Sequence, residues 1–380
     1  MLSQRLEQQH HLVLIQYLHR KTPMRYLLIV FAFSFLNSVN AQERYQSEVK
    51  SASIEFIRSL DPIQKRRAML SFDDTARLQW NNLPIGLRAR AGIPIEKMSD
   101  SQRVLLHRIL SASLSSQGYL KATSIFHLDN LLMNYYDSLY AQQKIEKRMF
   151  DFVKTLQWSH KNFYLAFFGS PADPRWGLKL EGHHLSLNFS FAGNELAVTP
   201  FFIGTDPAEY PINEYAGWRV LGQEEDLGIK LIKSLTAAQD KKAIIGKEAP
   251  GDIFTGAETG KRRLDYQGLK VSEMTKEQKQ LVEQIIREYV FNMDYDKAIT
   301  EYDKIIKAGI ENIYFAWIGP KDEKIPHYFM LNGPTFLIEF DNNGFAGQAN
   351  HIHTIWREKG NEFGEDVLRK HYSENHKIQK

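Results

Sequence analysis

Apolar residues recur at helical spacing in two stretches that begin with the same signature. Residues 98–114, MSDSQRVLLHRILSASL, and residues 274–290, MTKEQKQLVEQIIREYV, both start Met-Ser/Thr-x-x-Gln followed by a basic residue. In each stretch the Ser or Thr is the expected N-cap, and the Gln three residues later completes a capping box. The pattern therefore predicts two equivalent helices.

Apolar runs typical of strands also occur twice and in the same order. The matched segments are NFYLAFFG (162–169) with NIYFAWIG (312–319), LEGHHLSLNF (180–189) with LNGPTFLIEF (331–340), and WRVLGQE (218–224) with WREKGNE (356–362). Each half predicts a three-stranded antiparallel meander, with strands at 162–169, 177–191 and 195–203 in the first half and at 312–319, 327–341 and 348–356 in the second. Asn342-Asn343-Gly344 supplies a hairpin signal between the last two.

Four matches in one order favour an internal duplication. The repeated unit comprises helices, a three-stranded meander, a Trp-Arg turn and a closing helix, with pseudo-repeats at 98–238 and 274–372. The Lys-, Gly- and Pro-rich stretch 239–270 is interpreted as the connection between them. We expect one α+β domain over residues 42–380. The alternative is two unrelated segments with similar periodicity.

The N-terminal region changes this picture, because it is not expected in the mature protein. Residues 24–41, MRYLLIVFAFSFLNSVNA, have a basic start, an apolar stretch and a small-residue end, as in a secretory signal peptide. Residues 1–23 are polar and are interpreted as a dispensable extension before the true start. The chain contains no cysteine, which excludes a disulfide framework. The sequence therefore predicts an exported protein, periplasmic or secreted.

Charge argues against large charged partners. The chain has 48 Lys and Arg against 45 Asp and Glu, and residues 1–41 hold four of the basic and one of the acidic residues. The remaining residues carry equal numbers of basic and acidic side chains, so we expect neither nucleic-acid binding nor attraction to an anionic membrane. No stretch after the signal peptide is long and apolar enough for stable membrane insertion.

Candidate chemistry comes from polar residues that occur in only one of the two halves. His351 and His353 alternate in NHIHTIW, so they point to the same side of a strand. His184, Glu339 and Asp341 are expected on polar faces of neighbouring strands, whereas Glu181 and His183 are expected on the apolar face. Three imidazoles with a carboxylate suit Zn, Cu or Fe. The alternative is a set of solvated histidines on an exposed strand.

The predicted metal ligands are therefore His184, His351 and His353. Glu339 or Asp341 is expected to serve as the fourth ligand or as the general base that accepts a proton from a metal-activated water.

A loop unique to the first half is the second candidate feature. Residues 204–217, GTDPAEYPINEYAG, carry two prolines and separate the third strand from Trp218. Long loops on a rigid sheet often contribute to binding. We therefore expect Asp206, Glu209 and Tyr210 to contact a substrate. The alternative is a loop that only packs against the sheet.

Motifs along nearly the whole mature chain resemble one known family. The segments WGLKLEGHHLSLNF, GWRVLGQEEDL, FAWIG, FLIEFDN, NHIHTIWRE and FGEDVLRKHY occur in this order. Together they resemble the family catalogued as domain of unknown function 3500, which implies an exported, largely bacterial protein without an assigned activity. The family pattern includes the positions of His183-His184, of Glu339 and Asp341, and of Asn350 to His353. Tyr is commoner in the family at the position of Phe340.

Two functions are consistent with these observations. The first is an exported metal-dependent enzyme, a hydrolase or oxidoreductase, acting on a small molecule. The second is a non-catalytic envelope protein that binds a glycan or small organic ligand through aromatic residues such as Trp176, Tyr210 and Tyr215.

Overall fold

The computed structural model describes residues 46–257, 265–344 and 348–369. The expected signal peptide and the N-terminal extension lie outside these residues. Within them, no helix is both long and apolar enough to cross a membrane.

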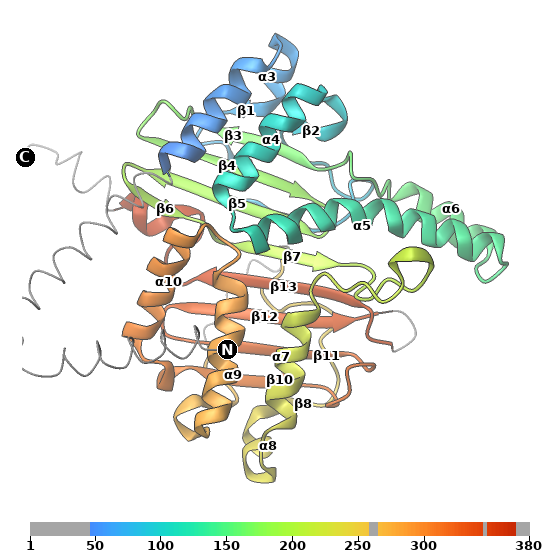
Figure 1. Ribbon diagram of the computed structural model, residues 1–380, viewed down its shortest axis with the longest axis vertical. Coiled ribbons are helices and arrows are strands. Elements are labelled where there is room, and N and C mark those ends of the chain that lie inside the picture. Colours follow the sequence, from blue (N-terminus) through green and yellow to red (C-terminus); the bar gives the residue numbers. More distant parts are fainter. Residues whose placement is uncertain (1–45, 258–264, 345–347, 370–380) are drawn as a thin grey trace, which may run out of the picture.

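A single mixed sheet forms the centre of the molecule (Figure 1). Its thirteen strands, among the described residues, are β1 (Met69–Leu70), β2 (Ile93–Pro94), β3 (Tyr164–Phe168), β4 (Arg175–Gly182), β5 (Leu185–Ala192), β6 (Glu195–Ala197), β7 (Phe201–Thr205), β8 (Ile244–Gly246), β9 (Leu269–Lys270), β10 (Tyr314–Ile318), β11 (His327–Asn332), β12 (Phe336–Asn343) and β13 (His351–Glu358). The main path runs β1-β3-β4-β5-β7-β13-β12-β11-β10-β8. The predicted α+β class is therefore confirmed, and the chain forms one domain.

The two halves of the sequence meet at the centre of this sheet. Strands β3, β4, β5 and β7 come from the first half, and β10, β11, β12 and β13 from the second, in mirror order about the β7–β13 pair. That pair is antiparallel, with Thr354 opposite Ile203 and His353 opposite Gly204. The start of β13 consequently lies beside residues of the first half.

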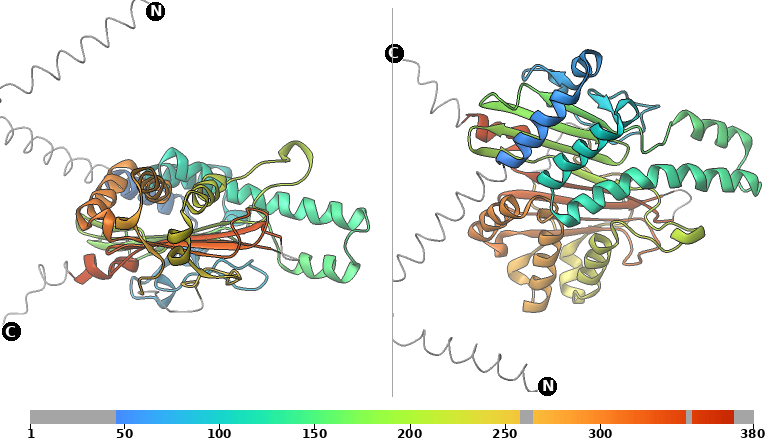
Figure 2. Two further views of the ribbon diagram at one scale, coloured as in Figure 1. Left: turned by 90° about the horizontal axis from the view of Figure 1, so that it is seen from below. Right: turned by 45° about the horizontal axis from the view of Figure 1, so that its top comes forward.

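Helices cover one face of the sheet (Figure 2, left). They are α3 (Pro62–Ala68), α4 (Asp100–Ser113), α5 (Ser116–Ala141), α6 (Lys147–Thr155), α7 (Gly222–Lys233), α8 (Ala237–Ala243), α9 (Lys276–Val290) and α10 (Tyr295–Ala308). Residues 46–59 add another helix to this layer. The predicted capping boxes are present at the starts of α4 and α9. Apolar faces of these helices and of the sheet form the main core.

Two irregular segments, 71–92 and 247–257, and the helical segment 362–369 lie on the opposite face of the sheet (Figure 2, left). Buried carboxylates on the sheet hold both irregular segments. Glu181 on β4 accepts a hydrogen bond from Asn81 N at 2.5 Å and lies 3.4 Å from Arg90 Nε. Glu339 on β12 accepts from Phe254 N and Thr255 N at 2.7 and 3.1 Å. Burying these polar faces is favourable because the loop backbones supply the hydrogen bonds.

The strand prediction needs two corrections in the first half and one in the second. The expected strand 195–203 is divided into β6 and β7, because Pro200 lies between them and has no N–H to continue the ladder. Segments 177–191 and 327–341 were each expected to be one strand, but each is a hairpin, β4–β5 and β11–β12. The first hairpin turns at His183 and His184, and His184 has a positive φ of 58°. Reversal at these residues places Glu181 opposite Ser186, on the polar face rather than the apolar one.

The prediction of a Trp-Arg turn is also wrong for the second half. Trp356 and Arg357 lie inside β13, whereas Trp218 precedes α7 in a loop. The shared Trp-Arg letters therefore do not mark equivalent positions. Strand residues tolerate Trp and Arg well when, as here, the Arg side chain finds partners: Arg357 Nε donates to Thr255 Oγ1 at 2.8 Å.

Candidate metal centre

Pairing of β5 with β7, and of β7 with β13, brings three histidines together. His184 lies at the turn before β5, and His351 and His353 lie at the start of β13. The backbone fixes His184 on both sides: its N–H donates to Asn82 O at 3.1 Å, and its carbonyl accepts from Gly204 N at 2.8 Å. The site thus sits where the two halves of the sheet join.

The three imidazoles converge through their Nε2 atoms. His184 Nε2 lies 2.7 Å from His351 Nε2, which lies 3.1 Å from His353 Nε2. A metal with ligand bonds of about 2.0–2.1 Å in tetrahedral geometry requires nitrogens about 3.3 Å apart. The observed separations are close to this value, and all three ligand atoms fall within 4.8 Å of one another. The cluster therefore has the composition and size of a three-histidine metal site.

Groups around the cluster orient the rings. His353 Nδ1 lies 2.7 Å from Asp252 Oδ1, and His351 Nδ1 lies 4.0 Å from Asp206 Oδ2. Asn82 Nδ2 lies 3.4 Å from His353 Nε2. A carboxylate on the second ring nitrogen fixes the tautomer that presents Nε2 to a metal and raises the basicity of the ligand.

Burial keeps one of the ligands neutral. His184 is 3% exposed, and burial, and then the neighbouring histidines, hold its pKa well below the ordinary value. Metal binding requires the neutral imidazole, so this shift favours coordination at neutral pH. The site opens on the side of His351, whose side chain is 31% exposed against 14% for His353.

Gly204 allows the rings to approach. It lies opposite His353 in the β7–β13 pair. A Cβ at this position would lie 3.1 Å from Cδ2 of both His184 and His353, and 2.6 Å from the Ile352 carbonyl oxygen. Only glycine fits here, because the contact with the backbone cannot be relieved by a side-chain movement.

The two predicted carboxylates occupy different environments. Asp341 lies directly opposite His353 in the β12–β13 pair, and its buried Oδ1 has no hydrogen-bond partner among the described residues. Burial raises the pKa of Asp341 to about 7. Glu339 lies opposite Ile355, two residues further along the same strand pair and away from the cluster. Its oxygens accept from two loop amides, from Thr255 Oγ1 and from Tyr328 OH.

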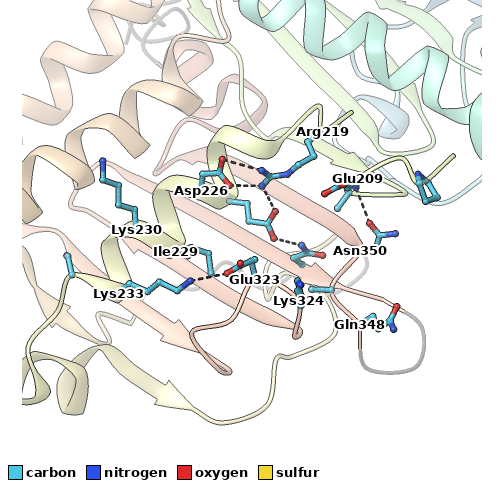
Figure 3. A pocket seen from close by; sticks show the side chains of 16 residues that line it. Glu209, Arg219, Asp226, Ile229, Lys230, Lys233, Glu323, Lys324, Gln348 and Asn350 are labelled. Atoms are coloured by element: carbon cyan, nitrogen blue, oxygen red, sulfur yellow. Dashed lines mark hydrogen bonds and ion pairs between the residues drawn. The ribbon is translucent and has the colours of Figure 1, made fainter. Parts of the chain in front are cut away.

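The three loop residues expected to contact substrate also lie in different environments. Asp206 lies next to His351, and burial raises its pKa to about 6. Glu209 lines an open cavity of about 1230 Å³ that reaches Asn350, the neighbour of His351 (Figure 3). Ala208 N and Glu209 N donate to Asn350 at 2.9 and 3.0 Å. Tyr210 is fully buried, and its hydroxyl donates to Leu131 O at 2.9 Å.

The walls of that cavity carry both signs of charge. Arg219 pairs with Glu225 and Asp226 at 2.8 and 2.7 Å, and Lys233 pairs with Glu323 at 3.0 Å (Figure 3). The cavity lies on the helix-covered face and reaches the strand end that carries His351 through Asn350. None of the three histidines lines it, and His353 contacts Asp252 of segment 247–257 on the opposite face.

A buried histidine–carboxylate pair beside the cluster was not predicted from the sequence. His183, 6% exposed, was expected to be a core or sheet-edge residue. Its Nδ1 lies 2.7 Å from Asp129 Oδ1 on α5, its ring stacks on Trp158, and it lies 3.8 Å from the His184 ring, centroid to centroid. Asp129 and Asp252 carry no sequence signal, because each comes from an element whose position depends on tertiary packing.

The aromatic residues of the alternative function are less available. Trp176 is 3% exposed and stacks on Phe191 at 4.0 Å between ring centroids, and Tyr210 is inaccessible. Tyr215 packs against Trp218 and His127. Trp176 and Tyr210 therefore stabilise the fold, and of the three named aromatic residues only Tyr215 is partly exposed.

Together, the fold and the cluster define an α+β protein with a three-histidine cluster whose ligand atoms lie close enough to hold a metal ion. The chain matches the family model described as "Protein of unknown function (DUF3500)" over residues 42–365, and it belongs to that family. No curated protein and no solved structure matches it. The expected family is thus confirmed, and the chemistry has to be argued from the site itself.

Proposed function

We propose that the protein is a metal-dependent enzyme, a hydrolase or oxidoreductase, with His184, His351 and His353 as metal ligands. The convergence of their three Nε2 atoms is the observation that carries the proposal. The ligand set suits Zn²⁺, Cu²⁺ or Fe²⁺, because imidazole binds each of them well. Three protein ligands leave a coordination position open, as in catalytic rather than structural zinc sites.

The surrounding residues support catalysis in separate ways. A bound metal would supply a Lewis acid that activates a water molecule or polarises a substrate oxygen. Asp341 faces His353 and has an acceptor atom without a partner, so we propose it as the proton acceptor. Both carboxylate oxygens of Glu339 accept hydrogen bonds, most of them from segment 247–257. We therefore propose that its role is to position that segment. Asp206 and Glu209 border the side from which a small polar substrate would approach.

Metal content tests the proposal directly. The full-length protein, purified without an affinity tag, is expected to contain about one equivalent of a single transition metal by inductively coupled plasma mass spectrometry. His351→Ala with His353→Ala should abolish this content, and His127→Ala with His160→Ala, two exposed histidines outside the cluster, should leave it unchanged. Removal by chelator should lower the melting temperature. Absence of stoichiometric metal, or equal content in the two double variants, would eliminate the proposal.

We also propose that the protein is exported, to the periplasm or beyond the cell. The support is the signal-peptide pattern in residues 24–41, with a basic start, an apolar stretch and a small-residue end. N-terminal sequencing of the mature protein from cell fractions tests it. Processing near Ala41 is expected, and an unprocessed cytoplasmic chain would contradict export.

We infer further that the two halves descend from one duplicated unit that starts earlier than residue 98. Support comes from two matching hydrogen-bond clusters. Gln102 bonds Gln64 and the Ser59 carbonyl, and Gln278 bonds Gln239 and the Ser234 carbonyl. In both halves a short helix, α3 or α8, leads into an edge strand that is parallel to its neighbour. The segments SLDPIQKRRAML and SLTAAQDKKAII carry this pattern in the sequence.

A further inference from the structure

A second cavity lies on the helix-covered face and shares no residue with the histidine cluster. Its volume is about 310 Å³, and it is formed by α4, α5, the residue after β2 and the residues before β3. This volume is at the lower end of the range for small-molecule sites, about 300–1,000 Å³. The cavity therefore suits a ligand smaller than a disaccharide.

The floor of this cavity is apolar. Ile95, Leu106 and Phe126 line it, and all three are buried, with exposures of 7%, 1% and 7%. Phe126 is held in place by Phe163, with 4.4 Å between the ring centroids. Such a floor favours the apolar body of a ligand and disfavours a bare inorganic ion, which would lose its hydration without compensation.

The remaining lining residues are all basic: Arg103, His107, His160 and Lys161. Acidic side chains do not contribute to the lining of this cavity. The nearest ion pair joins Arg103 to Asp100, at 2.8 Å, and the Asp100 side chain is 98% exposed. So exposed a pair is weak, and the positive charge of Arg103 remains available.

Arg103 offers an unused donor edge. Its Nη1 donates to Asp100, whereas its buried Nε has no hydrogen-bond partner among the described residues. A buried donor without a partner costs free energy unless a ligand satisfies it. The Nε and Nη2 edge of a guanidinium matches the two oxygens of a carboxylate, which it binds with two parallel hydrogen bonds.

The hydrogen bonds of His160 determine which of its ring nitrogens carries the proton. The His160 N–H donates to Asn130 Oδ1 at 3.0 Å, which orients the amide so that Asn130 Nδ2 faces His160 Nδ1 at 2.5 Å. Nδ1 is then an acceptor, and the proton of the neutral ring must reside on Nε2. His107 Nδ1 is similarly engaged, by Tyr119 OH at 2.9 Å. Nε2–H of His160 is thus left as a donor at the rim.

We propose that this cavity binds a small monocarboxylate with an apolar body, such as an aromatic or short aliphatic acid. The carboxylate pairs with the Nε and Nη2 edge of Arg103 and with Lys161, and the body packs on Leu106 and Phe126. The site is independent of the histidine cluster, so its loss leaves the metal content unchanged.

Calorimetric titration of the full-length protein with benzoate and hexanoate tests the proposal. Both acids are expected to bind at one site, and the uncharged analogues benzamide and hexanamide at least tenfold more weakly. Arg103→Met should weaken benzoate binding tenfold or more, Arg103→Lys less, and Lys161→Met two- to fivefold. Arg148→Met, an exposed basic residue on α6, serves as the matched control and should bind as the wild type does.

Three outcomes would overturn the proposal. Equal affinity for benzoate and benzamide would show that charge recognition is absent. Sulfate competing as well as benzoate would mean an adventitious ion only. Unchanged affinity in Arg103→Met and Lys161→Met would remove the assigned donors. Circular dichroism verifies folding, and if Arg103→Met unfolds, Arg103→Lys and Lys161→Met decide the result.

Discussion

His184 Nε2 lies 2.7 Å from His351 Nε2, although 167 residues separate them in the chain. Two imidazole lone pairs repel at this distance unless one neutral ring donates its Nε2–H to the other or a metal ion lies between them. His353 Nδ1 lies 2.7 Å from Asp252 Oδ1, so the neutral His353 ring carries its proton on Nδ1 and presents the lone pair of Nε2 to the cluster, 3.1 Å from His351 Nε2. The metal ion that we propose would bind the lone pairs of all three rings.

The first prediction concerns Asp252, which orients a ligand from segment 247–257. Its carboxylate contacts His353 Nδ1 at 2.7 Å. Asp252→Asn removes the negative charge that makes the imidazole a stronger ligand, so metal affinity should fall about 10–100-fold. Competition with a chromogenic chelator measures the change.

The exposed Asp303 on α10 provides the control for this substitution. Asp303→Asn should leave the affinity within about twofold. If Asp252→Asn binds metal as tightly as the wild type, Asp252 does not orient a ligand.

The second prediction separates Asp341 from Glu339. Asp341→Asn keeps the shape of the side chain but removes the proton acceptor, so turnover of a generic ester such as p-nitrophenyl acetate should fall about 10²–10⁴-fold with full metal content. Glu339→Gln should instead lower the melting temperature, because it weakens the hydrogen bonds to Phe254 N and Thr255 N. Loss of metal in Asp341→Asn would identify Asp341 as a ligand rather than a base.

Much of the candidate site was predictable because it rests on short-range periodicity. His351 and His353 alternate in a strand, so their common orientation followed from the sequence. His184 was assigned to the cluster by the matching of two halves, although its own strand was misassigned. A two-residue hairpin turn at His183-His184 lacks the Gly or Asn that usually marks one, and the strong apolar run on both sides concealed it.

The remaining parts of the site depend on tertiary placement. Asp252 lies in a stretch interpreted only as a connection, and Asp129 lies on a long helix whose rotation about the sheet no local pattern specifies. Gly204 follows Ile203 in a strand without any turn signal. Its necessity becomes visible only when two rings from other strands are known to pass over it.

The third prediction concerns the matching glutamines of the two halves. Gln278 receives a hydrogen bond from Thr275 N at 2.9 Å and donates to Ser234 O at 2.8 Å, while being 3% exposed. Gln278→Ala and Gln102→Ala should each lower the free energy of unfolding by about 2–3 kcal/mol, because buried partners lose their hydrogen bonds. Urea denaturation measures both, with the exposed Gln280→Ala on α9 as control.

Similar losses are expected from the inferred duplication. A large effect at one position and none at the other would argue that the two clusters are not equivalent in energy.

The fourth prediction uses the buried amine of Lys179 on β4. It donates to the carbonyls of Ala76 and Gln79 in segment 71–92, and burial lowers its pKa to about 8. In the unfolded chain the pKa returns to about 10.4. Between these values the unfolded chain binds more protons, so the stability of the folded protein rises as pH increases from about 8 to 10.

Lys179→Met removes this titration. The difference in unfolding free energy, wild type minus variant, should therefore grow by on the order of 2–3 kcal/mol between pH 8 and pH 10.5. Chemical denaturation at several pH values measures it, and the exposed Lys144→Met should run parallel to the wild type. Parallel curves for Lys179→Met would mean that this amine keeps an ordinary pKa in the folded state.

The last prediction concerns Gly204, which contacts the cluster without being a ligand. An added methyl group would meet Ile352 O at 2.6 Å and the rings of His184 and His353 at 3.1 Å. The shortest contact, at 2.6 Å, is with the backbone of β13, so β7 and β13 must shift apart slightly, and the imidazoles must move as well. Movement of two ligands by a few tenths of an ångström disrupts the geometry that a metal requires, and affinity should fall at least tenfold.

Gly256→Ala is the matched control, because its Cβ would find no atom nearer than 3.5 Å. Chelator competition compares the two variants, and the melting temperature of each metal-free form separates local from global damage. If Gly204→Ala lowers metal affinity while the metal-free stability stays within about 1 kcal/mol of wild type, the two rings must hold the ion jointly. Unchanged affinity would mean that at least one of these histidines does not coordinate a metal, since both cannot keep their positions beside an added methyl group.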